Sequence, residues 1–232
     1  MIEGKKVLAV TLARGGSKSI PKKNITPINN RPLIDFTINE ANQSNYIDRY
    51  IVSTDDNEIA NISLECGAEI PFLRPKDLSN DVATSAAALI HAVESINEDF
   101  DYVIELMATN PLKTKVHIDE CIEMLHFKSL DSVVAVKRVL DGHPSRLKYI
   151  EDGFLKDFYP EIPESRRQDL TPEAYIRCGS IYAMKKTFLL QSKARYGLNT
   201  GAYIMPDDAV INIDEPMDLM IAKMLMDKKI DS

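Results

Sequence analysis

Residues 6–24 read KVLAVTLARGGSKSIPKKN, and this stretch decides the fold class. Lys6 to Leu12 is a short apolar run rich in β-branched residues, which predicts a buried strand. A turn with two adjacent glycines, Gly15 and Gly16, follows at once, and four cationic residues surround it. Ligands of α/β sheets bind where loops leave the carboxyl ends of strands, so we expect a ligand site at this loop.

Strand and helix patterns alternate outward from this segment. Strand-like runs occur at 48–54, 69–73, 102–106, 132–136, 180–184 and 209–213. Helical patterns occur at 32–41, 56–66, 84–95 and 116–127, and a last helix begins at 214–216. This order predicts an α/β fold with a doubly wound, mostly parallel, Rossmann-like sheet covered by helices on both faces.

The loop after the first strand has the composition of a phosphate-binding loop. Arg14, Lys18, Lys22 and Lys23 surround Gly15-Gly16-Ser17. Glycines let backbone amides approach phosphate oxygens closely, and the cations neutralise a triphosphate. The spacing is neither GxxxxGK[ST] nor GxGxxG, which excludes a literal P-loop or dinucleotide fingerprint. A solvated basic loop is the alternative, but the clustering at a strand end favours phosphate binding.

The composition of the chain excludes some classes of binding partner and indicates a cellular compartment. A formal net charge of −7 argues against a nucleic acid or an anionic membrane as the main partner. The three cysteines lie far apart without a CxxC pair, so we expect neither a disulfide scaffold nor a zinc site, and a reducing cytoplasm suits them. The apolar run before Arg14 is too short for a signal peptide or a membrane span.

Residues 140–176 interrupt the alternation. RLKYIEDGFLKDF places Asp152-Gly153 between two alternating stretches, which is a strong β-hairpin signal. Such a hairpin has too few apolar residues to be stable alone, so we expect it to protrude and to lean on a second subunit. The predicted division is a catalytic nucleotide-binding domain of 1–139 and 177–232 with a dimerisation insertion at 140–176.

The sequence resembles the acylneuraminate cytidylyltransferases, the CMP-sialic acid synthetase family. Their phosphate loop runs close to ARGGSKGIPxKN, which residues 13–24 match except at Ser19. The resemblance continues in order through IVSTDDNEIA, LRPKDLSNDVATS, TNPLKT, SIY and NIDEPMDL, so it covers nearly the whole chain. It implies a cytoplasmic, homodimeric nucleotidyltransferase that uses CTP and Mg²⁺, or Mn²⁺, to activate an acidic nine-carbon sugar.

The resemblance implies which residues hold the nucleotide. They come from the first loop and from the region after Leu73: Arg14, Gly15, Gly16, Ser17, Lys18, Lys23, Asn24, Arg74, Asn80, Thr84 and Ser85. Arg14, Lys18 and Lys23, together with Asp214, form the expected catalytic set. Taken without the resemblance, Arg74 is as well explained as an ordinary arginine at a strand end.

The resemblance also implies a sugar site formed by Met107, Arg146, Arg167 and Tyr182. The two arginines match positions that reach the sugar carboxylate across the dimer interface, where a guanidinium can make two parallel hydrogen bonds. Alternatively, Arg166 and Arg167 form a solvated pair, and Tyr182 is a buried sheet tyrosine. Met107 stands where the family carries glutamine, which removes one polar contact to the sugar.

The metal site implied by the resemblance is altered here. The family's Asp-Ile-Asp unit is Asn212-Ile213-Asp214 in this chain. Residues two apart on a strand share a face, so Asn212 and Asp214 would still present oxygens to one cation, although the neutral amide weakens the site. Asp214 is also explained as the N-cap of the last helix.

The implied reaction is in-line attack of the anomeric hydroxyl of a nonulosonic acid on the α-phosphorus of CTP, which releases pyrophosphate. Positioning and charge neutralisation would do most of the work. Met107 and Asn212 leave two alternatives open: a nucleotidyltransferase for another NTP or a sugar phosphate, and a non-catalytic nucleotide-binding regulator. A glycosyltransferase is disfavoured because Asp55-Asp56-Asn57 is not Asp-x-Asp.

Overall fold

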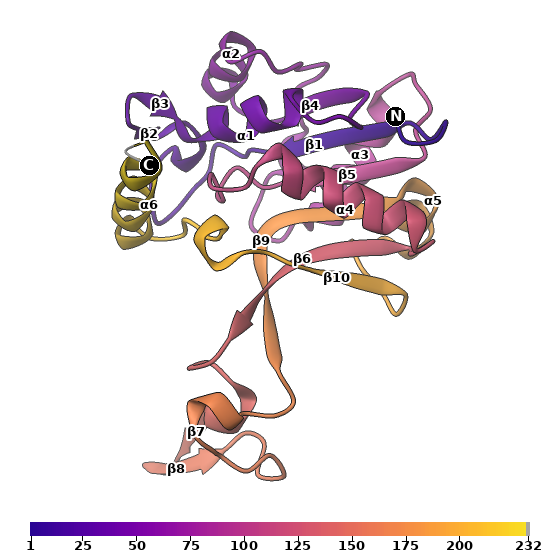
Figure 1. The fold of residues 1–232 in the computed structure, drawn as a ribbon. Helices are drawn as coiled ribbons and strands as arrows, with labels where there is room; N and C mark the ends of the chain where they lie inside the picture. The colour runs from indigo at the N-terminus through magenta and orange to yellow at the C-terminus, as the bar shows by residue number, and fades with distance from the viewer. Residues whose placement is uncertain (231–232) are drawn as a thin grey trace.

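A six-stranded sheet forms the centre of the molecule in the computed structural model, which describes residues 1–230 (Figure 1). The strand order is β10-β6-β9-β5-β1-β4. The strands are β1 (Val7–Leu12), β4 (Arg49–Ser53), β5 (Tyr102–Leu106), β6 (Ser132–Val139), β9 (Ala174–Lys185) and β10 (Thr200–Ile204). β1 pairs in parallel with β4 and β5, β6 pairs in parallel with β10, and β9 alone runs antiparallel to both neighbours. The predicted α/β fold with a mostly parallel sheet is confirmed.

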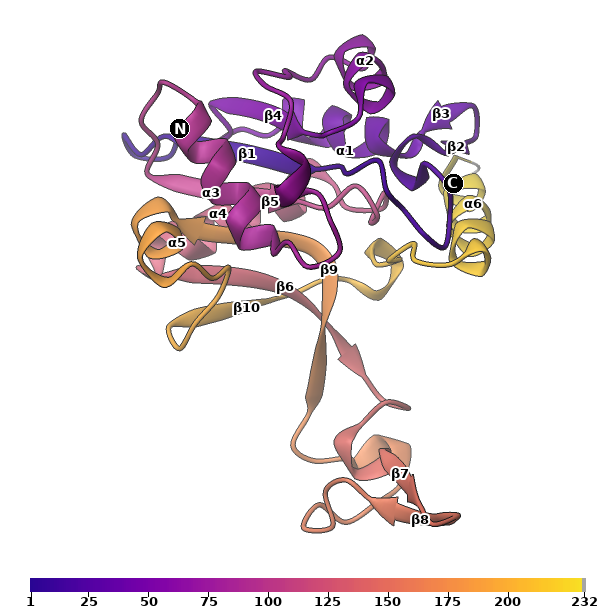
Figure 2. The same cartoon turned by 180° about the vertical axis from the view of Figure 1, so that it is seen from behind.

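Helices cover both faces of the sheet (Figures 1 and 2). They are α1 (Leu33–Asn42), α2 (Asn57–Glu65), α3 (Ser85–Ser95), α4 (Lys115–Phe127), α5 (Lys186–Ser192) and α6 (Pro216–Ile230). Side chains alternate along β1, so Val7 and Ala9 share a core with α1 and α4, whereas Leu8 and Val10 share one with α3 and α5. In the described part of the chain, no helix is long and apolar enough to cross a membrane.

The start and end of α2 follow the predicted local signals. The Asp56 carboxylate accepts hydrogen bonds from the amides of Glu58 and Ile59, at 2.8 and 3.1 Å. It thereby satisfies two of the amides that a helix start leaves without partners. The helix ends before Gly67, whose φ of +91° is a backbone conformation that glycine adopts without strain. Asp56 therefore sets where the chain turns away from β4.

Two predicted strands are wrong. Residues 69–73 make only isolated bridges, from Glu69 to Ile51 and from Leu73 to Thr54, because the segment touches the edge of β4 without following it. Residues 209–213 belong to a 3₁₀ turn (Asp207–Ala209) and an irregular stretch. Their apolar side chains pack into the core without joining the sheet ladder. The strand at this edge of the sheet is β10, not residues 209–213. It was not predicted because its sequence, TGAYI, lacks a clear apolar alternation.

The insertion protrudes from the sheet as a separate lobe (Figure 1). β6 and β9 leave the sheet as a paired ladder that ends at Val139 and Ala174, and the lobe lies between those residues. It carries the predicted hairpin, β7 (Lys148–Glu151) and β8 (Phe154–Asp157), joined by Asp152 and Gly153 at φ +53° and +82°. Apolar side chains of this hairpin are largely exposed, with Ile150 at 75% and Phe154 at 70%. The lobe thus presents apolar surface that its own chain leaves uncovered.

Candidate active site

A cleft of about 350 Å³ opens at the carboxyl ends of β1 and β5. Its lining includes most of the predicted nucleotide-binding residues, together with Met107: Arg14, Ser17, Lys23, Asn24, Arg74, Asn80, Thr84 and Ser85. Three of these side chains are cationic, and two carboxylates, Asp81 and Glu105, complete the charged lining. The fold therefore brings together residues from three separate segments of the sequence, as expected for a ligand site at strand ends.

The first loop directs two of its cations to one carboxylate. Arg14 Nη1 lies 2.9 Å from Asp81 Oδ1, and Lys18 Nζ lies 2.6 Å from Asp81 Oδ2. The two cations lower the pKa of Asp81, with hydrogen bonds from Lys18 and then Arg14 as the main causes. All three side chains are substantially exposed, so these pairs contribute little to stability. Arg14 and Lys18 thus converge on one anion at the mouth of the cleft.

Packing leaves no room for a side chain at Gly15. A Cβ at Gly15 would lie 2.7 Å from Asp56 Oδ2, which is the carboxylate that caps α2. The Gly15 amide donates to Asp55 Oδ1 at 3.1 Å, and the buried Asn24 side chain donates to the Arg14 carbonyl at 3.2 Å. At Gly16 a Cβ would meet no atom within 4 Å. The loop is therefore fixed at Gly15 and Asn24, with open space beside Gly16.

Lys23 ties the first loop to the predicted metal-binding segment. Its Nζ donates to the Ile213 carbonyl at 2.8 Å and to Asp214 Oδ1 at 3.0 Å. The segment is not a strand, so the predicted reason for pairing Asn212 with Asp214 is wrong. Their side chains nevertheless hydrogen-bond to each other, and Asn212 Oδ1 accepts from the Thr109 hydroxyl at 2.8 Å. Thr109 lines the cleft, so this segment borders it.

The far wall of the cleft holds the predicted base-binding group. Arg74 is only 5% exposed and donates from Nε to the Ser79 hydroxyl at 2.9 Å. Burial lowers the pKa of Arg74, whereas Asp55, 4.0 Å away, favours the charged form. Thr84 caps α3 by accepting from the Ala87 amide at 3.1 Å. A desolvated guanidinium with few competing waters is suited to binding a planar acceptor group.

The floor of the cleft contains a buried ion pair that sequence reasoning missed. Glu105 is 2% exposed and accepts from Arg195 Nη1 at 2.7 Å. Burial raises the pKa of Glu105, and the neighbouring charge of Arg195 opposes that rise. The two residues lie 90 positions apart in the sequence, so no local pattern indicated that they meet.

Tyr182 lies beneath this ion pair. It is 4% exposed and does not line the cleft. The Arg195 guanidinium lies over its ring, with Cζ 4.1 Å from the ring centroid, in a cation–π contact. Tyr182 is therefore a buried tyrosine of the sheet, and its place near the sugar stays a prediction.

Lys113 fixes the loop that follows β5. Its side chain is fully enclosed, and Nζ donates to the Thr37 hydroxyl at 2.6 Å and to the carbonyls of Met107 and Asn110, both at 2.7 Å. Burial lowers the pKa of Lys113 to about 7, against the attraction of Glu40. Because Met107 and Thr109 line the cleft, Lys113 holds part of its wall from behind.

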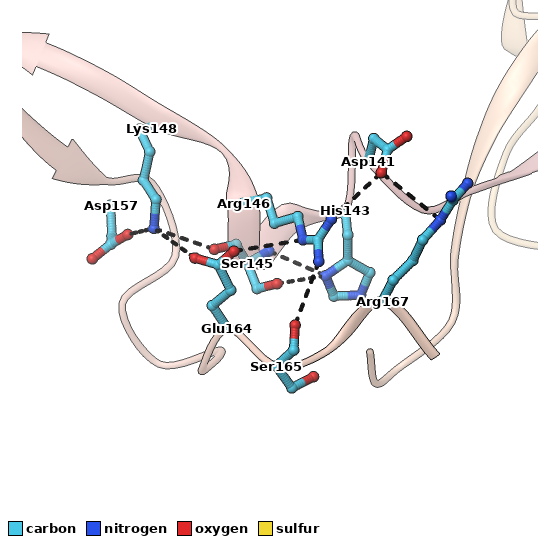
Figure 3. A network of polar contacts seen from close by, with 9 residues as sticks. All are labelled: Asp141, His143, Ser145, Arg146, Lys148, Asp157, Glu164, Ser165 and Arg167. Carbon is cyan, nitrogen blue, oxygen red and sulfur yellow. Dashed lines mark hydrogen bonds and ion pairs between the residues drawn. The ribbon is translucent and has the colours of Figure 1, made fainter. Parts of the chain in front are cut away.

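The two arginines predicted to bind a sugar carboxylate lie in the protruding lobe and do not line the cleft of the same chain. Both face Asp141, whose Oδ1 lies 3.4 Å from Arg146 Nη1 and 3.8 Å from Arg167 Nε (Figure 3). Beside them, the buried His143 ring contacts the Ser145 hydroxyl at 2.9 Å and the Pro172 carbonyl at 2.8 Å. The lobe thus gathers two guanidiniums around one carboxylate.

Several known proteins are similar to this chain. A family model described as cytidylyltransferase matches residues 8–193. A pseudaminic acid cytidylyltransferase of Campylobacter jejuni is 34% identical over 224 residues, covering 95% of this chain and 96% of that protein. An N-acylneuraminate cytidylyltransferase of Escherichia coli is 30% identical and covers 97% of this chain, which spans 53% of that longer protein.

Solved structures share the fold. A CMP:2-keto-3-deoxy-manno-octonic acid synthetase complexed with CTP aligns over 97% of this chain and 99% of its own, with a TM-score of 0.74 and 19% sequence identity. At that identity the likeness concerns the arrangement of helices and strands.

Proposed function

Because the chain belongs to the cytidylyltransferase family, we propose that it transfers CMP from CTP to the anomeric hydroxyl of a nonulosonic acid, an acidic nine-carbon sugar, in the cytoplasm. The observation that carries the proposal is the cleft at the strand ends, where Arg14, Lys23 and Arg74 meet. The names of the relatives, pseudaminic acid and N-acylneuraminate cytidylyltransferase, support the class of sugar.

In this proposal, different walls of the cleft bind the phosphates and the base of the nucleotide. Arg14 and Lys18 release Asp81 and bind phosphate oxygens of CTP instead. Lys23 neutralises negative charge near the phosphate that is transferred. The backbone beside Gly16 provides the open approach that a phosphate needs. Arg74, held by Ser79, faces the cytosine with Asn80, Thr84 and Ser85. The protein accelerates the transfer by holding the reacting groups in line.

Asn212 and Asp214 fit a magnesium ion that the substrate phosphates help to bind. Mg²⁺ commonly takes one or two carboxylates and completes its octahedral shell with phosphates and water. Asp214 supplies the carboxylate, and the Asn212 side chain lies beside it, with Nδ2 donating to Asp214 and Oδ1 accepting from Thr109. The Asn212 amide would turn its oxygen toward the ion on binding. In residues 1–230 no group of three or more His, Cys, Asp or Glu side chains offers a denser set. When bound, Mg²⁺ or Mn²⁺ would supply charge neutralisation at the phosphates.

The sugar half of the site requires a second subunit in this proposal. Arg146 and Arg167 lie in a lobe that projects away from the sheet, so they reach a cleft only if the lobe packs on another chain. The exposed Ile150, Phe154 and Leu155 supply apolar surface for such an interface. In a symmetric dimer each lobe would then complete the partner's cleft, with the arginines exchanging Asp141 for the sugar carboxylate.

The test is release of pyrophosphate from each of the four NTPs with Mg²⁺ or Mn²⁺, against sialic, legionaminic and pseudaminic acids and a set of sugar 1-phosphates. We expect release only with CTP and a nonulosonic acid. Release with a sugar 1-phosphate or another NTP would replace the proposed substrates within the same reaction class. Binding of CTP without release from any pair would instead favour a regulatory protein.

A further inference from the structure

Two buried charges of opposite sign line the cleft, Arg74 and Glu105, and each has a charged partner outside the cleft lining. Asp55 lies 4.0 Å from Arg74 Nη2, and the charge of Glu105 also favours the charged form of Arg74. Glu105 in turn accepts from Arg195 at 2.7 Å. Arg74 and Glu105 both line the cleft and are both almost completely buried, at 5% and 2% exposure. A buried cation and a buried carboxylate therefore share the lining of one cleft.

Arg195 is held in the position from which it neutralises Glu105. It comes from the segment between α5 and β10, and its guanidinium lies against the Tyr182 ring. Tyr182 is the cross-strand partner of Glu105 in the β5–β9 ladder, so the ring and the carboxylate are fixed side by side by the sheet. Stacking on one fixed group and bonding to another leaves the Arg195 side chain little freedom. Its own side chain is 20% exposed.

We propose that Arg195 is a positioning residue for the nucleotide base: by pairing with Glu105 it leaves Arg74 facing the cleft. The proposal rests on the proposed role of Arg74 in binding cytosine. A buried carboxylate that loses its partner attracts the nearest remaining cation, since an unpaired buried charge is strongly unfavourable. Arg74 is the most buried cation of the cleft lining that Glu105 shares, and the charge of Glu105 acts on it. Without Arg195, Arg74 would turn from Ser79 to Glu105 and its donors would no longer meet the base.

The test compares Arg195→Met with wild-type protein by calorimetric titration of CTP and of inorganic triphosphate. We expect the Kd for CTP to rise about tenfold, in the range typical of substitutions that act through a neighbour. The Kd for inorganic triphosphate should stay unchanged, because that ligand has no base. Equal losses for both ligands, or no loss for CTP, would overturn the proposal.

The chain offers a matched control in Arg177, which lies over the Tyr196 ring at 5.0 Å and donates to its hydroxyl at 2.9 Å. Arg177→Met removes the same kind of arginine–tyrosine contact outside the cleft lining and should leave both Kd values unchanged. A loss of CTP affinity equal to that of Arg195→Met would mean that removal of any such stacked arginine is enough, against the proposal.

The double variant Glu105→Gln with Arg195→Met separates positioning from general damage to the fold. A neutral amide no longer attracts Arg74, so we expect most of the CTP affinity to return. Additive losses in the double variant would contradict action through Glu105.

Arg74→Met tests the assumption that Arg74 binds the base. If this variant leaves the Kd for CTP unchanged, the proposed role of Arg74 fails. If CTP affinity falls in Arg74→Met but not in Arg195→Met, only the inference about Arg195 is rejected.

Discussion

The cleft and the lobe both collect arginines around carboxylates, but they hold them in different ways. In the cleft, Arg74 is 5% exposed, and the sheet fixes the buried Glu105 in the same lining. In the lobe, the Arg146 side chain is 25% exposed and that of Arg167 is 60% exposed, around an Asp141 that is itself 79% exposed. The sheet core orders the first group, whereas the lobe buries few apolar side chains of its own.

In the proposed function, this difference separates the half of the site that one chain completes from the half that needs a second chain. The cleft has preorganised donors, which is the arrangement that favours charge stabilisation without further rearrangement. The lobe offers charges at the end of a long ladder with uncovered apolar surface beside them. In the proposed function we therefore expect a single chain to bind the nucleotide and a pair of chains to bind the sugar, and the substitutions below test that division.

The largest effect is expected from Lys23→Met. Lys23 joins the first loop to Asp214, and its side chain is only 15% exposed. Loss of an oriented charge at the transferring group should lower kcat/KM by at least about a hundredfold. Steady-state pyrophosphate release measures this, and Lys22→Met, which removes a neighbouring exposed lysine paired with Glu58, is the control. Near-normal turnover in Lys23→Met would remove this loop from the chemistry.

Lys113→Met tests how firmly the cleft wall is held from behind. The substitution leaves the Met107 and Asn110 carbonyls without their donor, so we expect about 2 kcal/mol less stability at pH 7 by urea unfolding. The pKa of Lys113 falls to about 7 on folding from an ordinary value near 10.5, so folding disfavours its protonated form. Wild-type stability relative to Lys113→Met should therefore increase as pH rises from about 7 to about 10. A difference that stays flat across this range would contradict the lowered pKa.

Arg167→Lys tests the lobe. A lysine keeps the charge but cannot make two parallel hydrogen bonds to a carboxylate, so the KM for the nonulosonic acid should rise about tenfold. The Kd for CTP should not change, because Arg167 lies outside the cleft. Arg166→Lys is the control, since Arg166 pairs with Asp169 and is 77% exposed. A matching loss of CTP affinity in Arg167→Lys would break the division between cleft and lobe.

Asp81→Asn should have the smallest effect. Asp81 pairs with both Arg14 and Lys18. In the proposed function a triphosphate displaces Asp81 from these two cations. These exposed pairs are weak, so their removal should lower the Kd for CTP by only about threefold. Calorimetry at two salt concentrations measures this, and the gain should shrink at the higher salt. Weaker CTP binding in Asp81→Asn would mean that the carboxylate organises the loop instead of competing with phosphate.

Local signals in the sequence predicted much of this architecture. The first strand and loop, the Asp56 cap and the Asp152-Gly153 turn each depend on residues close together in the chain, and each is found where predicted. The direction of β9 was not predictable, because side chains alternate identically in parallel and antiparallel strands. The prediction of a strand at residues 209–213 was wrong because an apolar run fits an irregular buried segment as well as a strand.

In the candidate site, too, residues that are close together in the sequence were predicted and residues that are far apart were missed. The cations of the first loop were predicted as site residues because they cluster beside two glycines. Glu105 and Arg195 were missed because a strand pattern hides a charged residue among apolar neighbours and because their contact spans 90 positions. For the same reason the sequence did not indicate that Arg195 covers Tyr182.

Subunit mixing tests the division of the site most directly. One chain carries Lys23→Met in the cleft, the other carries Arg146→Met with Arg167→Met in the lobe, and the two are co-expressed so that mixed dimers form. If each lobe completes the partner's cleft, every mixed dimer regains one intact site, and random pairing gives about a quarter of wild-type activity. Activity no greater than that of the two variants alone would show that no site is shared between chains.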